Sequence, residues 1–218
     1  MTFSLEHLTR PPLLSTSDSA PVLVLLHGLG SNEQDLFSFA PHLDPRYRVL
    51  SVRAPRPYAY RGFAWFDINF GQGTPQPDQL QMADSKQRLL TFLDEVQKAY
   101  HPPRIYLAGF SQGSIMSYAI SLTQPTLVSG VLAMSGYVIR TSDLPTVATD
   151  SLKNLPIFAT HGLHDRVLPV FLGRSTRDYL QSLRLNHFTY QEYPMAHEVS
   201  PACFEDCQRW LSQQIAEL

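Results

Sequence analysis

Residues 109 to 113 of this chain read GFSQG, with one serine between two glycines. The apolar run IYLA precedes them, and apolar residues at helical spacing follow. This pattern is typical of a sharp strand-to-helix turn, in which side chains two residues from the serine would clash and the hydroxyl is exposed above the helix N-terminus. Glycine and serine are also common in ordinary turns. The interpretation of Ser111 as a nucleophile therefore depends on partners elsewhere in the chain.

A serine hydroxyl needs a base to take its proton and an acidic group to orient that base. After a turn of this kind the acid and the histidine follow in that order, each beyond the end of a later strand. Asp165 follows the apolar run PIFATH (156–161), and His197 follows FTYQEY (188–193). We therefore predict that Ser111, Asp165 and His197 form a catalytic triad. The alternatives are a helix-capping role for Asp165 and a polar loop position for His197.

Other acids and histidines fit this order less well. Asp143 and Asp150 precede the predicted strand that leads to Asp165, so we expect them at its other end or in a connection. His161 and His164 stand close to Asp165 but come before it, and we expect each to shape that loop.

A candidate oxyanion site follows the first strongly apolar run. HGLG (27–30) comes directly after VLVLL (22–26). A tetrahedral oxyanion is stabilised by preorganised donors, usually two backbone N–H groups. We expect Leu29 to supply one donor and Gln112, which follows the nucleophile at a helix N-terminus, to supply the other. A plain tight turn is the alternative interpretation of HGLG.

These residues need a scaffold in which strands and helices alternate. Strands are predicted at 22–26, 47–52, 104–108, 130–135, 156–161 and 188–193, and helices at 85–100, 113–123, 170–185 and 202–217. This alternation indicates a mostly parallel sheet with helices on both faces. In such sheets ligands bind beyond the carboxyl ends of the strands, which is where Ser111, Asp165 and His197 are expected.

Length and composition limit the class of protein that this chain can be. A length of 218 residues fits one domain, 1–218, whose residues 1–20 form an extension or an edge strand. A formal net charge of −2 gives no basic footprint for nucleic acid or anionic lipid. Neither a signal-peptide pattern nor an apolar run of about 20 residues occurs, so we expect a cytoplasmic protein without stable membrane insertion. Cys203 and Cys207 are predicted to be core-facing residues on one helix face.

Several motifs together resemble one family. HGLGSNEQDL, AP at 54–55, WFD at 65–67, GFSQGSIMS, and HGLHDRVLP with AHEV are similar to the phospholipase/carboxylesterase family of α/β-hydrolases, which includes acyl-protein thioesterases and small bacterial carboxylesterases. The match runs from about residue 20 to residue 216. The resemblance implies the α/β-hydrolase fold and the same triad and oxyanion donors. The mechanism that these residues predict needs no metal or organic cofactor. One departure is PMA before His197, where many relatives carry a glycine.

The region around the predicted site indicates which substrates it accepts. The interval 137–155 is too short and polar for a cap or lid domain, so we expect an open, shallow site. The aromatic loop 57–71 is long enough to wall an acyl groove with Trp65 and Phe66. Packing of that loop onto the core is the alternative, because aromatic side chains are mostly structural. By resemblance, the WFD segment borders the substrate.

We therefore predict a serine carboxylesterase that acts on short- to medium-chain esters, with a small-molecule ester as its substrate and a homodimer as a possible assembly. An acyl-protein thioesterase or a lysophospholipase is the alternative within the same chemistry. A binding protein on a hydrolase fold that has lost its activity is a further alternative from a different class.

Overall fold

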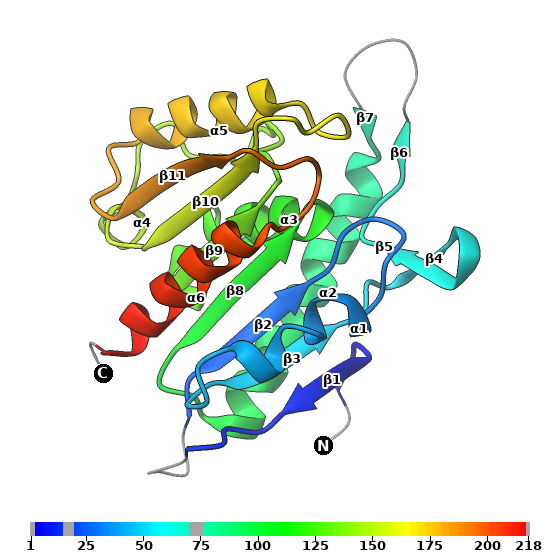
Figure 1. The fold of residues 1–218 in the computed structure, drawn as a ribbon, viewed down its shortest axis with the longest axis vertical. Helices are drawn as coiled ribbons and strands as arrows, with labels where there is room; N and C mark the ends of the chain where they lie inside the picture. Colours follow the sequence, from blue (N-terminus) through cyan, green and yellow to red (C-terminus); the bar gives the residue numbers. More distant parts are fainter. Residues whose placement is uncertain (1–2, 15–19, 70–75, 217–218) are drawn as a thin grey trace.

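A seven-stranded sheet runs through the centre of the molecule, in the order β1-β3-β2-β8-β9-β10-β11 (Figure 1). The computed structural model describes residues 3–14, 20–69 and 76–216. The sheet strands are β1 (His7–Arg10), β2 (Val22–Leu26), β3 (Arg48–Val52), β8 (Ile105–Phe110), β9 (Gly130–Met134), β10 (Ile157–Gly162) and β11 (Phe188–Tyr193). Strand β1 pairs antiparallel with β3 at one edge, and the strands from β3 to β11 pair in parallel.

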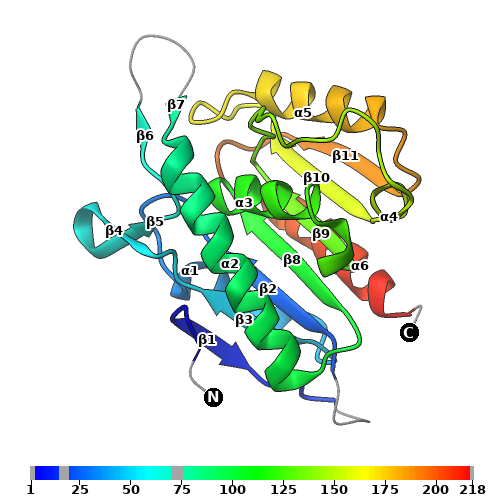
Figure 2. The same ribbon diagram turned by 180° about the vertical axis from the view of Figure 1, so that it is seen from behind.

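Helices cover both faces of this sheet. They are α1 (Gln34–Phe37), α2 (Gln79–Tyr100), α3 (Gln112–Ser121), α4 (Asp150–Lys153), α5 (Val170–Ser182) and α6 (Pro201–Ala216). Helices α2, α3, α4 and α5 pack into one hydrophobic core, and α2 and α3 lie in front of the sheet in Figure 2. Helices α1 and α6 pack into a second core on the other face. The two layers explain why the central strands are apolar on both faces.

The predicted α/β-hydrolase architecture is confirmed, with boundaries that differ by a few residues. Helix α2 begins at Gln79, six residues before the predicted start, because the Asp78 side chain accepts a hydrogen bond from the Gln81 N–H and caps the helix. Strand β8 extends to Phe110 and so ends next to Ser111. The buried Cys203 and Cys207 lie on the core face of α6, as predicted.

Two small hairpins were not predicted. One consists of β4 (Arg56–Tyr58) and β5 (Gly62–Ala64), and the other of β6 (Ile68–Asn69) and β7 (Gln76–Pro77). Strand β5, strand β6 and most of β4 lie within the aromatic loop predicted at 57–71, whereas β7 follows that loop. Residues 70 and 71 of the loop lie outside the described residues. The segment 135–149, where a cap domain would be inserted, contains no helix or strand. None of the helices in the described parts of the chain is long and apolar enough to cross a membrane.

Candidate active site

Ser111 occupies a strained turn between β8 and α3. Its backbone has φ 55° and ψ −116°, a conformation that L-residues rarely adopt. The turn brings backbone segments so close that a Cβ on Gly109 would lie 2.3 Å from the Gly113 backbone, and a Cβ on Gly113 would lie 1.8 Å from the Leu26 carbonyl oxygen. Glycine is therefore required at both positions, and the serine is held at the carboxyl end of a central strand.

Asp165 lies in the loop after β10 with its side chain fully buried. Its Oδ1 atom accepts hydrogen bonds from the N–H groups of Val167 at 2.9 Å and Leu168 at 2.8 Å. These two bonds fix the carboxyl group and leave Oδ2 for another partner.

His197, in the loop after β11, connects the other two residues. Its Nδ1 lies 2.6 Å from Asp165 Oδ2, and its Nε2 lies 2.9 Å from Ser111 Oγ. With a carboxylate accepting at Nδ1, the imidazole proton is on that nitrogen and Nε2 is free to accept from the serine hydroxyl. The Phe110 ring packs 4.9 Å from the imidazole ring, centroid to centroid. The structure thus brings together the three side chains predicted from the sequence, in a Ser–His–Asp arrangement.

The two loops that carry Asp165 and His197 are joined by backbone contacts. The Leu163 N–H donates to the Tyr193 carbonyl at 2.8 Å, and the His164 N–H donates to the Met195 carbonyl at 3.0 Å. A Cβ on Gly162 would lie 2.2 Å from the Ala196 carbonyl oxygen. The glycine at the end of β10 therefore permits the close approach of Ala196, the last residue of the PMA segment before His197.

A cavity of about 230 Å³ opens beside Ser111. The lining residues include Gly28, Leu29, Ile68, Phe110, Gln112 and His197. Among the residues that the structure describes, the N–H groups of Leu29 and Gln112 have no hydrogen-bond acceptor. The Gln112 N–H is also at the N-terminus of α3, where the helix dipole is positive. Both predicted donors are thus close to the serine and available.

The chain matches the family model described as Phospholipase/Carboxylesterase over residues 14–215. The chain belongs to this family. Together with the Ser–His–Asp arrangement, this makes the protein a serine hydrolase.

Curated relatives match most of the chain. The protein named acyl-protein thioesterase 1 from Kluyveromyces lactis is 27% identical over 209 residues, which cover 89% of this chain and 92% of that protein. The protein of the same name from Saccharomyces cerevisiae is 29% identical over 210 residues, with 89% and 92% covered. The crystal structure of the Bacillus cereus carboxylesterase superposes with a TM-score of 0.79 at 23% identity, covering 96% of this chain and 94% of that one. That last likeness supports the fold.

In this serine hydrolase a buried histidine supports the loop that carries Leu29. His27 Nε2 accepts a hydrogen bond from the Ala54 N–H at 3.0 Å, so Nδ1 carries the proton and donates to the Gly28 carbonyl at 2.7 Å. Burial lowers the pKa of His27, which keeps the ring neutral. The motif HGLG contained this residue, but the sequence gives no sign that Ala54 is its partner.

The same loop is held from the following residues. The Gly30 N–H donates to the Phe63 carbonyl at 2.9 Å, and the Phe63 N–H donates to the Ser31 carbonyl at 2.7 Å. Glu33, just beyond, accepts two hydrogen bonds from the Arg53 guanidinium at 2.6 Å each. This pairing lowers the pKa of Glu33 and keeps it ionised.

Trp65 and Phe66 do not line the cavity, in contrast to the prediction that they wall an acyl groove. Both side chains are fully buried in the core. The Trp65 indole N–H donates to the His27 carbonyl at 2.9 Å. The Gln112 side chain accepts from the Trp65 N–H at 3.0 Å and donates to the Phe66 carbonyl at 2.6 Å. These contacts therefore hold the HGLG loop and the Gln112 side chain in place, and Ile68 of the same segment reaches the cavity instead.

His161 supports the acid. It is fully buried, and its Nε2 donates to the Leu168 carbonyl at 2.7 Å and lies 3.6 Å from Asp165 Oδ2. Because Leu168 also donates to Asp165, the histidine fixes the loop segment that holds the carboxyl group. His164, by contrast, is exposed. Both histidines were expected to shape this loop. His161 contacts it through its side chain, whereas His164 contributes a backbone hydrogen bond to Met195.

Within the described residues, no group of three or more His, Cys, Asp or Glu side chains is placed to bind a metal ion.

Proposed function

We propose that the protein is a serine carboxylesterase that hydrolyses short- to medium-chain carboxylic esters through an acyl-serine intermediate. The observation that carries this proposal is the hydrogen-bond chain from Ser111 Oγ through His197 to Asp165, with distances of 2.9 and 2.6 Å, beside a cavity. These three hydrogen-bonded side chains supply a nucleophile, a base and an orienting acid.

In the first half of the reaction, His197 Nε2 takes the Ser111 proton as Oγ attacks the acyl carbon of the ester. Asp165 stabilises the resulting imidazolium through Nδ1. The N–H groups of Leu29 and Gln112 bind the tetrahedral oxyanion, a contribution that is typically worth about 10²-fold to 10³-fold in turnover per donor. His197 then gives its proton to the departing alcohol, and the acyl group remains on Ser111.

In the second half, a water molecule takes the place of the alcohol. His197 Nε2 accepts a proton from this water as the oxygen attacks the acyl carbon, and the same two amides bind the second oxyanion. Return of the proton to Ser111 Oγ releases the carboxylic acid and restores the enzyme. Every step uses groups of the chain and water.

The size of the cavity supports a short or medium acyl chain. At about 230 Å³ it is smaller than the roughly 300 to 1,000 Å³ of sites that enclose drug-sized ligands. The segment 135–149 adds no cap over it.

An acyl-protein thioesterase is the second candidate, supported by the names of the relatives from Kluyveromyces lactis and Saccharomyces cerevisiae at 27% and 29% identity. A lysophospholipase would use the same triad. The three activities differ in the acyl chain and the leaving group that they accept, not in the residues that react.

The test is hydrolysis of p-nitrophenyl esters from acetate to palmitate by wild type and Ser111→Ala. We expect the highest kcat/KM at short to medium chains and a loss of roughly 10⁴-fold or more in the variant. A maximum at palmitate, with matching activity on a palmitoylated peptide, would move the assignment to a thioesterase. Absence of Ser111-dependent hydrolysis at every length would exclude all three activities.

A further inference from the structure

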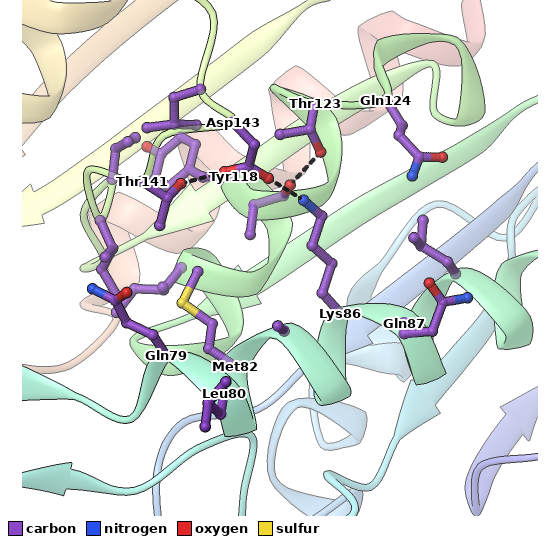
Figure 3. Close-up of a pocket in the computed structure, with 17 residues that line it drawn as sticks. Gln79, Leu80, Met82, Lys86, Gln87, Tyr118, Thr123, Gln124, Thr141 and Asp143 are labelled. Carbon is purple, nitrogen blue, oxygen red and sulfur yellow. Dashed lines mark hydrogen bonds and ion pairs between the residues drawn. The ribbon is translucent and has the colours of Figure 1, made fainter.

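A second and larger cavity, of about 500 Å³, lies between α2, α3 and the segment 138–144 (Figure 3). Its lining does not include Ser111, Asp165 or His197. Ile115 lines both this cavity and the one at Ser111. Since Ile115 comes one helical turn after Ser111, the second cavity begins about 6 Å along α3 from the nucleophile. The two cavities are therefore neighbours along one helix.

The second cavity runs away from the leaving-group side of the reaction. The alcohol must depart next to His197 Nε2, because that nitrogen protonates it. His197 comes from the connection between β11 and α6, and α6 packs on the opposite face of the sheet from α2 and α3. A substrate that extends from Ser111 along the groove between α2 and α3 therefore places its acyl part there.

The walls of this cavity combine apolar and polar surface. Its apolar part includes Leu90, Ile115, Tyr118, Ala119 and Val138. Its polar part includes three glutamines, Gln79, Gln87 and Gln124, and two threonines, Thr123 and Thr141. This combination suits a mainly apolar chain that carries a neutral hydrogen-bonding group.

Lys86 reaches from α2 across the cavity to the segment 141–143 (Figure 3). Its Nζ lies 2.9 Å from Asp143 Oδ2, and its side chain is 18% exposed. Thr141 donates to the other carboxyl oxygen of Asp143 at 2.5 Å. The hydrogen bonds from Thr141 and Lys86 lower the pKa of Asp143 and keep it ionised.

The ammonium group of Lys86 retains donors for a ligand. An ammonium has three N–H groups, and among the described residues Asp143 is the one hydrogen-bond acceptor of Nζ. Because Asp143 already balances its charge, the pair favours an uncharged acceptor over a second carboxylate.

Resting on the esterase function proposed above, we propose that the groove between α2 and α3 is a distal acyl subsite in which Lys86 hydrogen-bonds a neutral oxygen-bearing group, such as a terminal hydroxyl, on the substrate's acyl chain. The preferred substrates are then hydroxylated medium-chain esters. The purely apolar esters of the same length are poorer substrates because they leave the Lys86 donors without an acceptor.

The test compares p-nitrophenyl octanoate, decanoate and dodecanoate with the corresponding ω-hydroxy esters and with the ω-carboxylates. In wild type we expect the ω-hydroxy ester of the best-fitting length to exceed its parent roughly three- to tenfold in kcat/KM, as one hydrogen bond contributes. Lys86→Met should remove this preference. Lys98→Met is the matched control, because Lys98 lies on the same helix, is exposed and pairs with Asp94 outside the cavity.

A filling variant tests the groove independently of Lys86. Ala83 is exposed on α2 and lines the cavity, so Ala83→Phe should lower kcat/KM for dodecanoate relative to acetate. Equal ω-hydroxy preference in wild type and Lys86→Met, a preference for the ω-carboxylate, or an unchanged dodecanoate-to-acetate ratio in Ala83→Phe would each overturn the subsite. Failure of the esterase function itself would be distinct, because wild type would then hydrolyse none of these esters.

Discussion

The Nε2 atom of His27 accepts a hydrogen bond from the Ala54 N–H at 3.0 Å, and this single contact decides where the histidine carries its proton. A backbone N–H can only donate, so Nε2 must be unprotonated and Nδ1 must hold the hydrogen that is donated to Gly28. The carbonyl of Gly28 precedes the amide of Leu29, one of the two proposed oxyanion donors. Protonation of His27 at Nε2 would turn this acceptor into a donor and break the hydrogen bond from the Ala54 N–H.

His27 therefore makes the protein sensitive to acid. Its pKa is lowered in the folded state, chiefly by burial, from an ordinary value of 6.5. Below that pH the unfolded chain binds a proton that the folded chain does not, so stability falls as pH decreases from about 6.5 toward the folded pKa. Urea unfolding between pH 5 and pH 8 should show a flatter profile for His27→Gln than for wild type. The charges of Glu33, Asp35 and Arg53 also affect the pKa of His27. Asp35→Asn is therefore the control, because it removes one of these charges and keeps the histidine.

The proposed role of Asp165 gives a second prediction. Its carboxyl group accepts from Val167, Leu168 and His197, and an amide in its place would present a donor to Nδ1 and favour the wrong tautomer of His197. We expect Asp165→Asn to lower kcat for p-nitrophenyl esters by roughly 10³-fold to 10⁴-fold with a small change in KM. Asp94→Asn, at an exposed position of α2, should retain wild-type kinetics. Near-normal turnover of Asp165→Asn would remove Asp165 from the mechanism.

Much of this arrangement could be predicted because it follows from chain order. The ends of β8, β10 and β11 place Ser111, Asp165 and His197 at one edge of the sheet, and the apolar runs identify those strands. Residue types alone do not tell which side of a loop faces the substrate. The sequence therefore predicts Trp65 at the cavity, whereas in the structure its indole N–H donates to the buried His27 carbonyl.

Supporting contacts were less predictable because their partners are distant in the sequence. The Gln112 side chain joins residues 65 and 66, and His27 joins residue 54. The hairpin of β4 and β5 gave no alternating pattern because its strands are three residues long. Such contacts depend on tertiary packing, which overrides local preference.

His161 should act as a positioning residue for the acid. Its Nε2–H donates to Leu168, and the Leu168 N–H in turn donates to Asp165. We expect His161→Leu to lower kcat roughly ten- to a hundredfold through displacement of the Asp165 loop. His161→Gln keeps an N–H donor near the position of Nε2 and should restore most of the activity. The pH profile of kcat should also change in His161→Leu, since His197 loses a well-placed partner.

Equal unfolding midpoints must accompany this comparison, because His161 is fully buried and its replacement can lower stability alone. Activity that falls equally in His161→Leu and His161→Gln, with an unchanged pH profile, would assign the residue to packing only.

The strained backbone of Ser111 gives a prediction about stability. With φ 55° and ψ −116°, backbone strain at the serine destabilises the folded state by about 1 to 3 kcal/mol, whereas glycine adopts this conformation freely. Ser111→Ala and Ser111→Gly both remove the hydroxyl, but only glycine relieves the strain. After the larger backbone entropy of glycine in the unfolded chain is subtracted, Ser111→Gly should be more stable than Ser111→Ala by about 1 kcal/mol in urea unfolding. Ser117, inside α3, is the matched control: there glycine should be less stable than alanine by about 1 kcal/mol. The same order of stability at both positions would mean that the turn stores no strain at the serine.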